Sequence, residues 1–114
     1  MRQPQVALLP DGRRLHLQDG PIDLVIEAFG EEEAVAAAYA AAARRFTGLL
    51  DELVSELALL RAQACGNGAE LSGVVARRMH AAVAPFAGAC FITPMAAVAG
   101  AVAEEILQAM RRAA

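Results

Sequence analysis

The sequence contains no lysine and no tryptophan, and it has one tyrosine, four phenylalanines and two cysteines in 114 residues. Two cysteines are too few for a disulfide-stabilised mini-domain. The chain is nevertheless 57% hydrophobic and only 20% charged, which excludes an intrinsically disordered tail. About a quarter of the residues are alanine, whose side chain buries little surface. The composition therefore predicts a single domain over residues 1–114, with good helices and a thin core.

The charged residues form no basic surface. All ten basic residues are arginines, most of them in separated pairs, and the net charge is −3. Nucleic-acid binding is therefore not expected. Cys65 and Cys90 are far apart and form no CxxC motif, so we expect two reduced thiols. Their spacing from His80 matches no zinc motif, and no metal ligand is predicted.

One long segment, Met79 to Ala103, carries no formal charge when His80 is neutral. It is long enough to cross a bilayer. However, Pro85 and Pro94 interrupt it, and a helix that starts at Pro94 would leave backbone groups unpaired in lipid. The segment therefore predicts a buried part of a soluble fold. The apolar run near the N-terminus is too short for a signal peptide, so we expect a cytoplasmic protein.

The first thirty residues alternate like strands. Apolar runs at 5–9, 14–18 and 22–29 are separated by turn residues at 10–13 and by Asp19-Gly20. This pattern predicts a three-stranded antiparallel meander with Leu15 and Leu17 on its apolar face and His16 on its solvated face.

Helical periodicity follows. A stripe with three- and four-residue steps predicts a helix from Glu31 to Leu60, with a bend at Thr47-Gly48. Ser72 is expected to cap a second helix that ends near Ala84. Residues 85–92 are expected to form an apolar link, with a strand as the alternative, and Thr93-Pro94 starts a third helix. The predicted fold class is α+β, a meander followed by three helices.

Three segments resemble a known family. They are residues 9–24 (LPDGRRLHLQDGPIDL), 76–80 (ARRMH) and 91–100 (FITPMAAVAG). Together they resemble an uncharacterised bacterial and archaeal family related to ApbE, the FAD:protein FMN transferase. The resemblance implies an ApbE-like fold and, in the active relatives, FAD binding with magnesium-dependent transfer of FMN to a threonine.

The resemblance also implies a length difference. Members of that family are about twice as long, and their metal ligands lie in the later part, so magnesium is expected only with a missing C-terminal half. The chain is accordingly expected to be the N-terminal half of such a domain. The uncharged run from Met79 to Ala103 would then lack its cover, and we expect self-association or a homo-oligomer through it.

The candidate binding site lies at the start of the third predicted helix. Thr93, Pro94 and Met95 form a helix N-terminus, and Arg77 and Arg78 supply positive charge, so we expect a corner that binds the diphosphate of a flavin nucleotide such as FAD. The alternative is an ordinary N-cap with small residues packing behind it. Three functions stay open: an enzyme of flavin transfer, a noncatalytic binder of flavin or another small molecule, and a fragment without independent activity. No catalytic residue is predicted.

Overall fold

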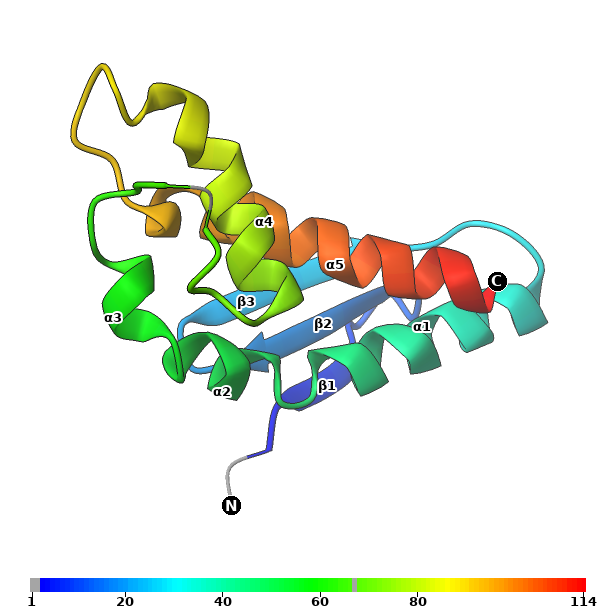
Figure 1. Ribbon diagram of the computed structural model, residues 1–114. Coiled ribbons are helices and arrows are strands. Elements are labelled where there is room, and N and C mark those ends of the chain that lie inside the picture. The colour runs from blue at the N-terminus through cyan, green and yellow to red at the C-terminus, as the bar shows by residue number, and fades with distance from the viewer. Residues whose placement is uncertain (1–2, 67) are drawn as a thin grey trace. The chain divides into compact units, whose positions relative to one another are not determined.

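The computed structural model describes residues 3–66 and 68–114 and has the predicted α+β fold (Figure 1). A three-stranded antiparallel sheet is followed by helices. The elements are β1 (Gln5–Leu8), β2 (Arg14–Asp19), β3 (Ile22–Glu27), α1 (Glu32–Phe46), α2 (Leu49–Val54), α3 (Leu57–Leu60), α4 (Val74–Val83), η1 (Ala84–Phe86), η2 (Pro94–Ala97) and α5 (Val98–Ala113), where η denotes a 3₁₀-helix.

The sheet has the predicted meander order, β1-β2-β3. Leu17 pairs with Val6 on one side and with Leu24 on the other, so these three side chains share one face. Leu15 and Leu17 are buried there, as the alternation predicts. The second hairpin loop is shifted by one residue from the prediction, because Asp19 still pairs with Ile22 and the two loop residues are Gly20 and Pro21.

Polar groups order the first turn and the outer face of the sheet. The Asp11 carboxylate accepts hydrogen bonds from the backbone N–H groups of Arg13 (2.9 Å) and Arg14 (3.1 Å) and from Arg14 Nε (2.7 Å). These bonds, the backbone ones first, hold the pKa of Asp11 well below its usual range. On the outer face, His16 Nε2 lies 2.6 Å from Asp23 Oδ1, so this histidine has a partner on the neighbouring strand.

The chain divides into two compact units. The first comprises Met1–Leu50 and Glu105–Ala114, and the second comprises Asp51–Glu104. In the first unit α1 packs against β2. The Tyr39 hydroxyl of α1 donates to the Arg13 carbonyl and accepts from the Ala28 backbone N–H at 3.1 Å. Phe46 and Leu49 are fully buried.

The first unit also contains a buried ion pair. Arg45 Nε of α1 lies 2.6 Å from Glu105 Oε2 of α5, and the Glu105 side chain is almost fully buried. Ile106, Ala109 and Met110 follow Glu105 on the buried side of α5. The ion pair therefore joins the first long helix to the last one within this unit.

In the second unit, α4 packs against both 3₁₀-helices. Val75, Met79 and Val83 of α4 are buried, as their helical spacing predicts. The loop between η1 and η2 extends beyond α4 in Figure 1 (yellow to orange). It contains the exposed residue Phe91, while Pro94 at its end is fully buried.

The single long helix predicted over residues 31–60 is wrong. The predicted break at Thr47-Gly48 occurs, because Gly48 has a φ of +83°, a conformation that ends α1 and reorients the chain before α2. A second interruption at Ser55–Glu56 separates α2 from α3. The leucine stripe continues across both breaks, since Leu49, Leu53 and Leu60 are all buried.

Residues 85–92 are an apolar link, as predicted, but the alternative that they form a strand is wrong. They form the end of η1 and a loop, because the Ala89 and Cys90 N–H groups donate turn hydrogen bonds to the Phe86 carbonyl. The long uncharged run is therefore divided among α4, η1, η2 and α5. In the described part of the chain, no helix has the length and apolar character needed to cross a membrane.

Candidate ligand-binding cleft

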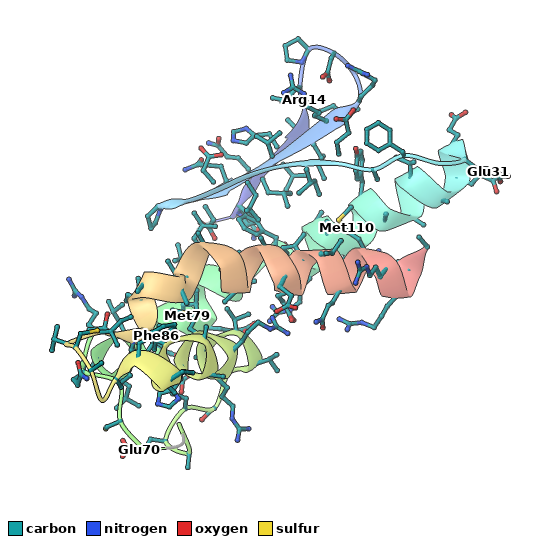
Figure 2. The ribbon with its side chains drawn as sticks, turned by 90° about the horizontal axis from the view of Figure 1, so that it is seen from above. Arg14, Glu31, Glu70, Met79, Phe86 and Met110 are labelled. Carbon is teal, nitrogen blue, oxygen red and sulfur yellow. The ribbon has the colours of Figure 1, made fainter. Side chains whose placement is uncertain are left out.

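A small cleft lies in the second unit, where the loop after α3 passes over α4 and Pro94. Its volume is about 190 Å³. The described residues that line it are Leu59, Ala62, Gln63, Ala64, Cys65, Gly66, Gly68, Ala69, Glu70, Leu71, His80 and Pro94. Most of these residues are apolar, and Figure 2 labels Glu70 on the loop. The cleft is smaller than the 300 Å³ or more of a typical drug-sized site, so it fits a small ligand only.

His80 fixes the loop to α4. Its ring is buried, and its Nε2 lies 3.0 Å from the Cys65 carbonyl oxygen, which assigns the ring proton to Nε2 because a carbonyl only accepts. Gly68 packs against the same ring with a φ of +75°, and a Cβ there would lie 2.8 Å from Nδ1. Any larger residue at position 68 would therefore displace the histidine. Asn67 of the Gly-Asn-Gly sequence lies outside the described residues.

Gln63 holds the opposite side of the cleft. Its Oε1 accepts from the Ile92 N–H at 2.7 Å, and its Nε2 donates to the carbonyls of Ala87 (3.1 Å) and Cys90 (3.3 Å). The Ala64 N–H also donates to the Ile92 carbonyl at 2.9 Å. One glutamine side chain thus orders the whole loop before Pro94. No local sequence pattern signals this role, because the partners are 24 to 29 residues away.

The helix that carries His80 is capped differently from the prediction. The N-cap residue of α4 is Gly73, and no side chain of its own segment caps it, so Ser72 is not the cap. Instead, Glu56 Oε1 accepts from the Ser72 N–H at 2.6 Å and Oε2 accepts from the Gly73 N–H at 3.0 Å. A carboxylate from a distant turn therefore accepts from the N–H groups of the N-cap and of the residue before it, and its negative charge lies at the positive end of the helix dipole.

Of the five residues predicted for nucleotide binding, only Pro94 lines the cleft. Thr93 precedes η2 with an extended backbone, but its side chain makes no capping hydrogen bond, and Met95 is half-buried in η2. Arg77 is exposed on α4. Arg78 lies 3.1 Å from Glu104 Oε2 and donates to the Ala101 carbonyl at 3.3 Å. These contacts direct the Arg78 guanidinium to α5.

A second, larger groove of about 600 Å³ lies near the Glu56 cap. Glu52, Glu56 and Glu70 line it, and Glu56 is already engaged with two backbone N–H groups. The groove is shallow and open. We therefore consider the smaller cleft, which is ordered by His80 and Gln63, the better candidate site. Among the described residues no cluster of three or more histidine, cysteine, aspartate or glutamate side chains is placed to hold a metal ion.

Comparison with known proteins gives one result. A family model described as "AbpE bacteria" matches residues 6–114, and the chain belongs to this family. No curated protein and no solved structure matches it significantly. The matching family is not that of ApbE and the FMN transferases, so the resemblance drawn from the three segments is wrong as an assignment.

Proposed function

We propose that this protein is a noncatalytic binder of a small, uncharged or cationic molecule, and that the ligand occupies the cleft beside His80. The observation that supports this proposal is the lining of the cleft. It combines apolar side chains with one carboxylate, Glu70, and includes no arginine among its described residues. A diphosphate would bring negative charge next to Glu70 with no cation to compensate it.

Size supports the same ligand class. A volume of about 190 Å³ equals roughly six water molecules at their liquid density. It can enclose a single ring with one polar substituent, whereas most of a dinucleotide would lie outside it. The apolar walls contribute affinity, and Glu70 selects the charge of the substituent.

The test compares benzylamine, benzoate and FAD, using the full chain and its amide resonances. Benzylamine is expected to shift the amides of residues 62–71 saturably, with a dissociation constant of about 1 mM, or about −4 kcal/mol. Benzoate is expected to bind at least about tenfold more weakly, because it meets the Glu70 carboxylate. Glu70→Gln should remove this difference by weakening benzylamine binding.

A matched pair of variants locates the binding. Ala62→Leu fills the cleft and should abolish the benzylamine shifts, whereas Ala58→Leu, at an exposed position in α3 that does not line the cleft, should leave them unchanged. Equal binding to both variants would show that the cleft is not the site. Saturable FAD binding without benzylamine binding would contradict the proposed ligand class and favour the nucleotide corner at Thr93 and Arg77.

A further inference from the structure

A groove lined by arginines lies in the first unit, between α1 and the C-terminal part of α5. Figure 1 shows the end of α5 (red) alongside α1, and the ion pair between Arg45 and Glu105 joins the two helices. The groove has a volume of about 450 Å³ and is lined by Ala41, Arg44, Arg45, Ala109, Arg112 and Ala113. We call it the arginine groove. Arginine pairs that are far apart in the sequence thus contribute three side chains to one groove.

The arginine groove has no acidic side chain among its described lining residues. The composition does not favour such a groove, because the chain has 13 acidic and 10 basic residues. Arg45 is compensated by Glu105, whose Oε2 lies 2.6 Å from its Nε. Arg44 and Arg112 are both exposed, and in the described part of the chain neither forms an ion pair. The groove therefore carries two positive charges that no described carboxylate compensates.

The helix dipole alone does not explain this arrangement. Arg44 lies in the last turn of α1, and Arg111 and Arg112 lie in the last turn of α5, where positive charge stabilises a helix. That effect applies equally to the two arginines of α5, but Arg112 lines the groove and Arg111 does not. Ala41 and Ala109 are buried and short, so the space beside the arginines stays open to a ligand.

The charge and the donor geometry select the ligand. A guanidinium group binds phosphate oxygens through two parallel N–H···O bonds, and two such groups match the two negative charges of a phosphate monoester or of free phosphate. We propose that the arginine groove binds a dianionic phosphate group, with Arg44 and Arg112 as the residues that hold it. This site is separate from the cleft beside His80, whose described lining belongs to the second unit.

The test titrates the full chain with glycerol 2-phosphate at about pH 8 and low ionic strength, following the amide resonances of residues 41–45 and 109–113. Saturable shifts are expected with a dissociation constant of about 1 mM, because exposed charge-assisted contacts give modest affinity. Dimethyl phosphate, a diester with one negative charge, should bind at least about tenfold more weakly. Inorganic phosphate distinguishes the two sources of the ligand. Tighter binding than glycerol 2-phosphate assigns the groove to free phosphate, and weaker binding assigns it to a phosphate monoester.

A matched pair of variants on α5 locates the site. Arg112→Gln should weaken the binding of glycerol 2-phosphate about tenfold or more, whereas Arg111→Gln, which removes the same charge from the same helical turn, should change it less than about twofold. Arg44→Gln should have the effect of Arg112→Gln. Ala113→Glu brings a carboxylate into the groove and should abolish binding, with Ala113→Gln as its neutral control. All four positions are exposed, so these changes should leave the circular dichroism spectrum unchanged.

Three results would overturn the proposal. The first is the absence of saturable shifts up to about 20 mM glycerol 2-phosphate. The second is an equal loss of affinity in Arg111→Gln and Arg112→Gln, which would leave only a general attraction of anions to the end of α5. The third is equal or tighter binding of dimethyl phosphate, which would assign the groove to a phosphodiester backbone instead.

Discussion

At the scale of single residues, the consecutive glutamates Glu104 and Glu105 have very different environments. The Glu104 side chain is 54% exposed and lies 3.1 Å from Arg78, whereas Glu105 is 8% exposed and lies 2.6 Å from Arg45. Both pairs join a helix to α5. Glu105 is largely removed from water and Glu104 is not, so the loss of the ion pair costs more at Glu105 than at Glu104.

This contrast gives a prediction with an internal control. Glu105→Gln should lower the free energy of unfolding by about 2 kcal/mol, because a weaker neutral hydrogen bond replaces the charge-assisted bond between the buried Glu105 and the half-buried Arg45. Glu104→Gln should change it by less than about 1 kcal/mol. Urea denaturation followed by circular dichroism measures both. Replacing both partners of the buried pair, with Arg45→Met and Glu105→Leu, should recover most of the loss, and a similar cost for both single variants would contradict this account.

At the scale of elements, the sequence predicts each strand and the start of α1 because their signals are local. Leu15 and Leu17 alternate with polar residues, and Glu31 is the N-cap of α1 while Glu32 and Glu33 lie in its first turn. The cap of α4 could not be predicted, because Glu56 is 16 residues from Ser72 in the chain. The cleft could not be predicted either, because Gln63 and His80 form hydrogen bonds with partners that are distant in the chain.

The Glu56 cap gives the prediction for this scale. Glu56→Ala should destabilise the protein by about 1–2 kcal/mol, because the N–H groups of Ser72 and Gly73, just before α4, lose their acceptor. Glu56→Gln should cost less, since its amide oxygen can still accept one bond. Glu70→Ala is the control from the same groove and should stay within about 0.5 kcal/mol of wild type. Amide exchange at Ser72 and Gly73 reports the loss directly, and unchanged protection there in Glu56→Ala would contradict the capping role.

At the scale of the whole molecule, the alanine-rich composition leaves few large side chains for the core. Phe46, Leu17, Leu49, Leu60, Met79 and Ile106 are the largest that are fully buried. Alanines fill much of the rest, among them Ala38, Ala41 and Ala42 of α1. Because small domains already bury a low fraction of their surface, we expect the isolated monomer to be only marginally stable.

Association of two copies would add stability by mass action, since it removes folded monomer from the unfolding equilibrium. The midpoint of thermal unfolding should therefore rise with protein concentration, by about 4–5 °C for a hundredfold increase in a chain of this size. Differential scanning calorimetry at several concentrations measures this dependence. A wild-type midpoint that does not depend on concentration would mean that the thin core suffices alone.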